Sequence, residues 1–142
     1  MGAGTAAQCQ RYLPGVASGD LRAAFTITEP QSGSDVAGIK TRAVKADGGY
    51  RLNGAKIWCT NAAVSDFIVL AAKTGEGDSR GQINFFIVPT ESPGLTIGPK
   101  EDKLCSRGVP SSPPFLEAGV LPADKMPVPG GGGGKQARRG VA

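Results

Sequence analysis

The sequence predicts a mainly β fold, a barrel or sandwich of about seven short strands that follows the end of a helix. Glycine and proline are frequent, with 22 Gly and 11 Pro among 142 residues, and they interrupt the chain at short intervals. Between these breaks, β-branched and aromatic residues form short runs, several of which alternate with polar residues. The length fits one domain with a modest core.

A short helix is expected first, over residues 6–13, which can form two helical turns. The pair Pro14-Gly15 should end it, because proline has no N–H with which to continue the hydrogen-bond ladder. We interpret residues 1–20 as containing the end of a helix, and residues 21–124 as a β-domain. Residues 125–142 are rich in glycine and have too little apolar surface to offset chain entropy, so we expect a disordered tail.

The strands of the β-domain are predicted from alternation and from the turn residues between them. Asp47-Gly48-Gly49 and Asn53-Gly54 are favoured turn sequences, so two consecutive hairpins are expected around them. Two apolar runs further along the chain should be buried strands of one sheet. The predicted strands are residues 21–28, 39–46, 50–52, 55–60, 67–73, 83–88, 95–97 and 114–120, and the two apolar runs are 67–73 and 83–88.

The residue types present exclude several kinds of site. The chain has no histidine, which removes Ser-His-Asp and Cys-His catalysis and histidine-based zinc sites. Its three cysteines, Cys9, Cys59 and Cys105, lie far apart and without paired spacing, so neither a disulfide framework nor a metal site is expected. We therefore predict a reduced compartment and no bound metal.

Charge and hydropathy bear on partners and localisation. The formal charge of +4 and the isoelectric point near 9.2 suit an anionic partner. Lys135, Arg138 and Arg139 supply three of the positive charges with no aromatic residue among them, so nucleic acid is not an expected partner. The longest apolar run, residues 67–72, is too short to span a bilayer, and no signal peptide is apparent. We expect a soluble protein without membrane contact, in the cytoplasm or, in a eukaryote, in the mitochondrial matrix.

Residues 28–35 combine hydroxyl groups, acidic side chains and Gly33, which lets a ligand approach the backbone. Such a loop suits a phosphate or the polar edge of a ring. The same residue types occur in any surface turn, however, and composition alone favours that ordinary interpretation. The role of Trp58 is also undecided by its residue type, because tryptophan suits a core position as well as a ligand site.

The order and spacing of several motifs resemble the acyl-CoA dehydrogenase family over residues 10–124. One motif is Thr28-Glu29-Pro30 followed by Ser32-Gly33-Ser34-Asp35, and another is Lys56-Ile57-Trp58 followed by Thr60-Asn61. The remaining matches are Arg11-Tyr12-Leu13-Pro14, Ala17-Ser18-Gly19, Leu52-Asn53-Gly54, Phe86-Ile87-Val88, Pro93-Gly94, Lys103-Leu104, Arg107, and Val120 with Pro122-Ala123. The chain resembles the middle β-domain of that family, and the resemblance implies that residues 21–124 are this domain and that residues 1–20 are the end of the N-terminal helical domain before it.

The resemblance implies an FAD site made from two separate segments. Thr28 would bond the isoalloxazine edge, and Ser34 would lie close to both the pyrophosphate and the acyl-CoA. Trp58 would cover one side of the flavin, and the Thr60 hydroxyl would donate to flavin N5. The full set of expected cofactor contacts is Phe25, Ile27, Thr28, Gly33 and Ser34 from the first segment, and Trp58, Cys59 and Thr60 from the second.

The resemblance also implies that the catalytic base lies elsewhere. In the family, a glutamate of the C-terminal helical bundle removes the α-proton, and that bundle would begin at residues 125–142. Glu29 and Asp35 invite a paired-carboxylate interpretation, but in the family these acids support the loop. We therefore name no catalytic residue, and we expect a truncated chain that is inactive alone.

The activity implied for the full enzyme is oxidation of the Cα–Cβ bond of an acyl-CoA, with hydride transfer to flavin N5. The resemblance further implies electron-transfer flavoprotein as the electron acceptor and a homotetrameric assembly. Two alternatives stay open. An acyl-CoA oxidase or flavin monooxygenase of the same fold would consume oxygen, and a non-catalytic relative that binds flavin or nucleic acid would retain DNA in a salt-dependent way.

Overall fold

The computed structural model describes residues 4–75 and 82–122. Within these residues strands predominate, which confirms the mainly β fold. The expected disordered tail at 125–142 lies outside the described residues. No helix in the described ranges is both long and apolar enough to cross a membrane.

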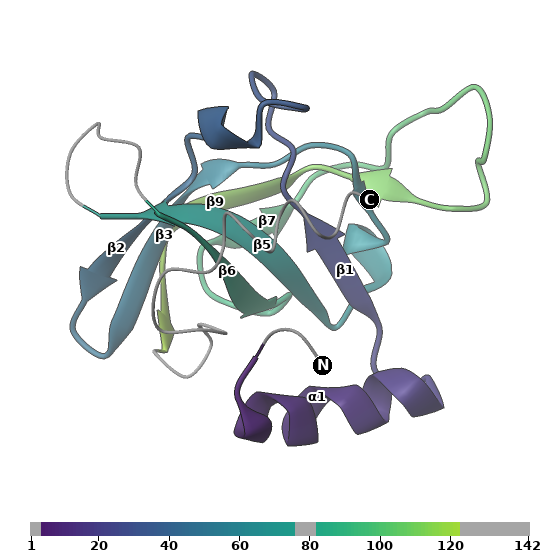
Figure 1. The fold of residues 1–142 in the computed structure, drawn as a ribbon. Helices are drawn as coiled ribbons and strands as arrows, with labels where there is room; N and C mark the ends of the chain where they lie inside the picture. Colours follow the sequence, from purple (N-terminus) through teal and green to yellow (C-terminus); the bar gives the residue numbers. More distant parts are fainter. Residues whose placement is uncertain (1–3, 76–81, 123–142) are drawn as a thin grey trace.

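Helix α1 (Ala6–Ser18) lies against one end of the sheet (Figure 1). Thr5 and Gln8 form a capping box at its start, and Gly19 ends it with a left-handed φ of 86°. The prediction that Pro14 ends the helix was wrong, because the helix continues through it. Proline removes a single donor, and the last turn is fastened by the bond from Leu21 N to the Gly15 carbonyl oxygen at 2.9 Å.

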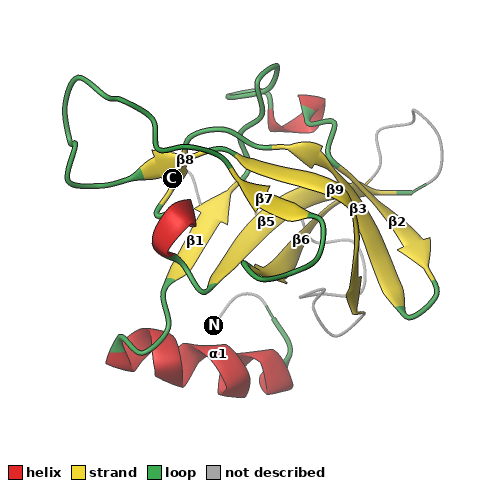
Figure 2. Cartoon of the chain, turned by 180° about the vertical axis from the view of Figure 1, so that it is seen from behind, coloured by secondary structure: helices red, strands yellow, loops and turns green. Residues whose placement is uncertain are grey.

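Seven strands of the described chain form one strongly curled sheet, which Figures 1 and 2 show from opposite sides. Along the sheet the order is β1-β5-β2-β3-β9-β7, and β6 pairs with β5. The two apolar runs predicted to be buried strands of one sheet are β5 and β6, and they pair antiparallel with each other. The strands of this sheet are β1 (Ala23–Thr26), β2 (Arg42–Ala46), β3 (Gly49–Ala55), β5 (Phe67–Thr74), β6 (Gln82–Pro89), β7 (Leu95–Ile97) and β9 (Pro114–Pro122).

Three shorter elements complete the described chain. Strand β4 (Cys59–Thr60) pairs with β8 (Ser111–Ser112) as a separate two-stranded ribbon. Two 3-10 turns lie at Val36–Gly38 and Ala62–Val64. The ribbon and the second turn lie beside β1, and this position brings them to the candidate site.

The core is one cluster of apolar side chains from the main sheet, strand β4 and the second 3-10 turn. Strand β5 is almost continuously buried, as expected of a strand covered on both faces. The ring of Tyr12 from α1 lies 4.8 Å from that of Phe67, so the helix covers part of one face of this strand. The core cluster is Ala24, Ala43, Leu52, Cys59, Ala62, Ile68, Leu70, Ala72, Phe86, Val88, Leu116 and Leu121.

The predicted second hairpin, at Asn53-Gly54, was wrong. Strand β3 runs straight through both residues and pairs with β9, with a register shift between Leu52 and Asn53. Residues 55–60 therefore do not return along β3, and Cys59–Thr60 pairs with β8 instead. The long pairing with β9 outcompetes the local turn preference. Only the first predicted hairpin, between β2 and β3, is present.

Candidate functional site

Two segments about 30 residues apart in sequence lie side by side at one end of β1. The Ile57 N–H donates to the Thr28 carbonyl oxygen at 3.0 Å. The Lys56 ammonium donates to the Ile27 carbonyl oxygen at 2.9 Å, and the Cys59 thiol lies 3.8 Å from the Phe25 carbonyl oxygen. The structure thus brings the two segments of the predicted site together through contacts to the carbonyl oxygens of Phe25, Ile27 and Thr28.

The first segment begins with Phe25, which is placed by the alternation of β1. Ala24 and Thr26 point into the core, so Phe25 points outward and is 56% exposed. Its ring lies 5.5 Å from that of Phe85 on β6. The exposed ring of Phe25, packed against the half-buried Phe85, offers an apolar surface to a ligand or to another part of a protein.

The second segment presents Trp58, whose side chain is 59% exposed. Its φ of 57° lies in the left-handed region, which a bulky side chain rarely adopts and which costs about 1–3 kcal/mol. Such a conformation persists only where neighbouring structure determines it. Here the Ile57 N–H is bonded to Thr28, and the following residues are held by the β4–β8 pairing.

The loop after Thr28 is a closed turn with an exposed tip. Glu29 and Ser32 exchange backbone hydrogen bonds of 2.9 and 3.0 Å, and the Ser32 hydroxyl donates to the Asp35 carbonyl oxygen. Gly33 and Ser34 lie at the exposed tip, and a Cβ at Gly33 would meet nothing within 4 Å. The structure shows no contact that brings this tip against the Trp58 segment.

Hydroxyl groups at the site are available as donors. Within the described part of the chain, no hydrogen bond engages the hydroxyls of Thr28, Ser34 or Thr60. Thr60 and Ser34 are exposed, and Thr28 is half-buried. These groups could therefore bond a polar ring edge or a phosphate. No group of three or more acidic or cysteine side chains that could hold a metal ion occurs in the described ranges.

Cys59 is placed differently from its neighbours. Its side chain is fully buried in the core, and burial raises the pKa of its thiol to about 11. Only the backbone of Cys59 could therefore face a ligand. The adjacent strand β8 holds Ser112, which is also buried, with a hydroxyl oxygen that has no hydrogen-bond partner in the described structure.

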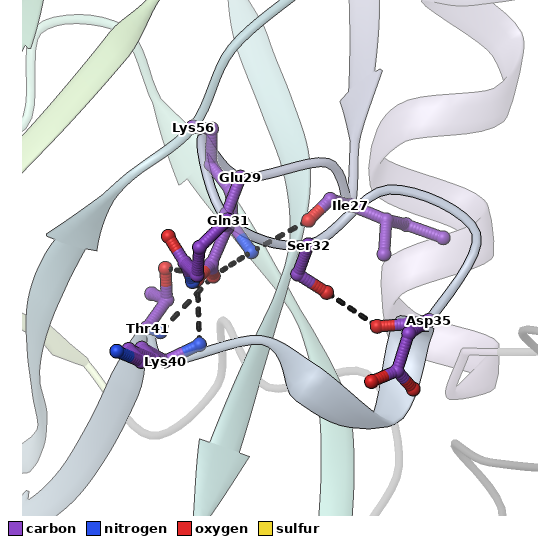
Figure 3. A network of polar contacts seen from close by, with 8 residues as sticks. All are labelled: Ile27, Glu29, Gln31, Ser32, Asp35, Lys40, Thr41 and Lys56. Atoms are coloured by element: carbon purple, nitrogen blue, oxygen red, sulfur yellow. Dashed lines mark hydrogen bonds and ion pairs between the residues drawn. The ribbon is translucent and has the colours of Figure 1, made fainter.

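Beneath the loop lies a buried polar network centred on Glu29 (Figure 3). The Lys56 ammonium donates to its carboxylate at 2.7 Å, and the side chains of the pair are 0% and 2% exposed. The Thr41 N–H donates at 3.0 Å, the Lys40 N–H at 2.5 Å and the Gln31 amide at 2.6 Å. The Thr41 hydroxyl also donates at 2.5 Å. The network joins the loop to the start of β2 and to the residues before Trp58.

Burial alone would raise the pKa of the Glu29 carboxyl. Hydrogen bonds from Lys56, Thr41 and the Lys40 N–H outweigh that effect and lower the pKa to about 2. Burial lowers the pKa of Lys56 from its ordinary value, and the Glu29 carboxylate opposes part of this change. A carboxylate held in this way is a structural anion and a poor proton acceptor.

The sequence did not predict this ion pair. Glu29 was expected to support the loop, and Lys56 was only a part of a motif. Lysine is almost never fully buried unless it is paired, so nothing in the sequence around Lys56 marks it as a core residue. The available signal was its position in the predicted strand 55–60, where alternation places Lys56 on the same face as Trp58 and Thr60.

The comparisons with known proteins identify the family of the chain. Residues 24–118 match the family model described as "Acyl-CoA dehydrogenase, middle domain". The chain therefore belongs to the acyl-CoA dehydrogenase family, and the matched part is its middle domain. It is 46% identical over 105 residues to 2-methylacyl-CoA dehydrogenase, mitochondrial, of Solanum tuberosum, covering 74% of this chain and 26% of that protein. It is 45% identical over 101 residues to an acyl-CoA dehydrogenase of Bacillus subtilis, covering 71% and 27%.

Solved structures show the same fold. An acyl-CoA dehydrogenase from Geobacillus kaustophilus superposes with a TM-score of 0.91 at 33% identity, over 97% of this chain and 37% of that one. The FAD complex of PigA superposes with a TM-score of 0.90 at 31% identity, over 96% and 36%. The chain thus spans about a quarter of the length of the curated relatives named above.

Proposed function

We propose that this chain is the FAD-binding middle domain of an acyl-CoA dehydrogenase that oxidises the Cα–Cβ bond of an acyl-CoA thioester. The observation that carries the proposal is Trp58, an exposed aromatic side chain in a left-handed conformation, bonded through Ile57 to the Thr28 segment. An exposed indole on a backbone held by its neighbours, with unengaged hydroxyls on Thr28 and Thr60 in the same two segments, suits a planar ring with polar edges.

The residues present fit FAD. Trp58 supplies an apolar face, Thr28 and Thr60 supply free hydroxyls, and a Cβ added at Gly33 would project into open space at the loop tip. When bound, FAD would accept a hydride at its N5 atom. In this proposal, the Thr60 hydroxyl donates a hydrogen bond at that atom and Trp58 excludes water from one face.

The other predicted contacts follow from their positions in the same arrangement. Phe25 and Ile27 contribute the carbonyl oxygens that face Cys59 and Lys56, so their segment would border the ring. Cys59 would contribute backbone contacts alone, because its side chain is buried. Ser34 at the loop tip would bind the pyrophosphate of the cofactor and the acyl-CoA.

The proton-abstracting group is proposed to lie outside the described residues. Glu29 is the acid nearest to Thr28 in sequence, but its carboxylate is committed to Lys56, Thr41 and Lys40, with a pKa of about 2. A general base for α-proton removal needs a carboxylate of higher pKa that can reach the substrate. The complete enzyme would therefore supply that group from another domain.

Substrate and partners are inferred from family membership. The relatives are named for acyl-CoA substrates, which supports an acyl-CoA thioester here. One structural neighbour is described as "Electron transferring flavoprotein of Acidaminococcus fermentans: Towards a mechanism of flavin-based electron bifurcation". It superposes with a TM-score of 0.87 at 33% identity. We infer that the complete enzyme passes electrons to an electron-transfer flavoprotein and assembles as a homotetramer.

The cofactor proposal is tested by titrating FAD into the 142-residue chain. Trp58 is the one tryptophan in the sequence, so intrinsic tryptophan fluorescence reports on the site alone. We expect saturable quenching as the flavin stacks on the indole, together with retention of flavin absorbance after filtration. The variant Thr60→Val should weaken retention, while Val44→Thr on the exposed face of β2 should not. Absence of both quenching and retention would contradict the proposal.

A further inference from the structure

Lys56 connects the two segments of the candidate site through its side chain. Its ammonium bonds to the Ile27 carbonyl oxygen at 2.9 Å and to the Glu29 carboxylate at 2.7 Å. Figure 3 shows Lys56 beside these two residues, which flank Thr28 in the sequence, and Lys56 itself lies two residues before Trp58. One buried ammonium therefore fixes the residues on both sides of Thr28 to the turn that presents Trp58.

The backbone around Lys56 is fixed as well. The Lys56 N–H donates to the Pro114 carbonyl oxygen at 2.8 Å, at the start of β9, and the next N–H donates to Thr28. Lys56 is thus attached both to the main sheet and to the first segment of the site. This attachment accounts for the left-handed conformation of Trp58, which needs such support.

Stability alone does not explain a charged pair at this depth. Replacing a buried ion pair with apolar side chains of similar size is often neutral or stabilising, because both charges must be removed from water. Yet the pair occupies a position where its side chains are 0% and 2% exposed. Apolar side chains could not make the hydrogen bond from Lys56 to the Ile27 carbonyl oxygen. They also could not accept the hydrogen bonds that Lys40 and Thr41 donate to Glu29.

Glu29 extends the connection to a second strand. Its carboxylate accepts from the Thr41 hydroxyl and N–H and from the Lys40 N–H, just before β2. Lys56 is therefore connected to the sheet at two places: directly by its backbone bond to Pro114, and through Glu29 to Thr41. These bonds hold the backbone of Trp58 and that of Thr28 at a set distance from each other before any ligand binds.

We propose that Lys56 and Glu29 are positioning residues, a buried pair that fixes Trp58 relative to Thr28 so that the site is formed before FAD binds. The identity of the ligand rests on the proposed function, but the effect on Trp58 does not. Forming the site in advance favours binding, because less conformational freedom is lost when the ligand arrives.

The experiment compares four variants of the 142-residue chain. Lys56→Met removes the ammonium and leaves a buried carboxylate, and Glu29→Gln/Lys56→Met removes both charges at similar volume. Glu29→Gln leaves the Lys56 ammonium without its counter-charge but keeps an oxygen that can accept from it, and it is the conservative variant. Leu121→Ala is the matched control, because this residue is 3% exposed but pairs with Tyr50 at the far end of β3.

Three quantities are measured for each variant: the thermal unfolding midpoint, the near-ultraviolet circular dichroism of Trp58 without FAD, and the dissociation constant for FAD. We expect the double variant to unfold near the wild-type temperature, to lose most of the Trp58 dichroism and to bind FAD about tenfold more weakly. Glu29→Gln should retain the dichroism. Leu121→Ala should lower the unfolding midpoint and leave the other two quantities unchanged.

Retention of the Trp58 dichroism and of the FAD affinity in the double variant would overturn the positioning role. So would an equal loss of both in Leu121→Ala, since the effect would then follow stability alone. If the double variant does not fold, the comparison of Glu29→Gln with Leu121→Ala decides, because the proposal requires the dichroism to survive in both. If wild-type chain binds no FAD, the proposed function fails, and the dichroism still decides the positioning of Trp58.

Discussion

Glu29 holds a negative charge where water does not reach it. Five donors from four residues surround its carboxylate, and its side chain is 2% exposed. Because these donors act only in the folded chain, the carboxyl has a lower pKa when folded than when unfolded. The value falls from an ordinary 4.5 to about 2.

This difference between the folded and unfolded pKa of Glu29 makes the free energy of unfolding depend on pH. A carboxyl whose pKa is lower in the folded state adds stability above its unfolded pKa, and that contribution is lost as the pH falls through the folded value. We expect the free energy of unfolding to decrease from about pH 4.5 down to about pH 2, as measured by urea unfolding at a series of pH values. The variant Glu29→Gln should show a smaller decrease over the same range. Parallel curves for the two proteins would contradict the assignment.

At the scale of the strand, Gly54 is what allows the network to approach β3. Its φ is 150°, and a Cβ built there would lie 2.5 Å from the Thr41 hydroxyl and 2.8 Å from the Thr41 Cα. The second of these contacts is with backbone, which cannot move aside as a side chain can. Strand β3 therefore needs glycine here to lie against the residue that bonds Glu29.

Gly54→Ala should accordingly destabilise the fold by more than about 1 kcal/mol, since the new Cβ is both strained and in collision. The matched control is Gly108→Ala, where a Cβ meets nothing within 4 Å and the backbone is not in the left-handed range. That change should stay within about 0.5 kcal/mol. Chemical denaturation of the two variants measures the difference, and equal midpoints would show that Gly54 is not constrained.

The same strand shows where sequence reasoning succeeds and where it fails. Asn53-Gly54 has the local chemistry of a hairpin turn, but the pairing of β3 with β9 is a contact between distant residues that no local pattern records. Pro14 misled in the same way, because packing of α1 on the sheet outweighs one missing donor. The apolar strands β5 and β6 were predictable, since burial imposes its own residue types.

The candidate site follows the same division. The two segments were predicted to meet, and they do so through Ile57 and Thr28. What escaped prediction was the burial of Lys56, because a lysine looks like a surface residue unless its partner is known. The burial of the Cys59 side chain was also not predicted, because Cys59 was expected to contact the ligand together with its neighbours. It lies between two residues expected at a ligand, and strand alternation turns its side chain inward.

At the scale of the whole molecule, the described residues form a candidate cofactor site without a base. Glu29 is committed to its ion pair, and Asp35 is exposed at the end of the loop, where its backbone closes the turn with Ser32. Oxidation of an acyl-CoA needs the α-proton to be removed as the hydride leaves, so binding of FAD alone would not suffice. Since the chain spans about a quarter of its curated relatives, the missing group is expected from the remaining length of such enzymes.

The 142-residue chain loaded with FAD should therefore not reduce its flavin when butyryl-CoA is added. The visible flavin absorbance should stay unchanged over a period in which the butyryl-CoA dehydrogenase of Megasphaera elsdenii, measured in parallel, loses its own. Dithionite should bleach both proteins, which shows that the bound flavin can still accept electrons. Bleaching of the chain by butyryl-CoA would mean that a carboxylate within these residues acts as the base. Asp35→Asn would then be the first variant to test, because Glu29 is held as a structural anion with a pKa of about 2.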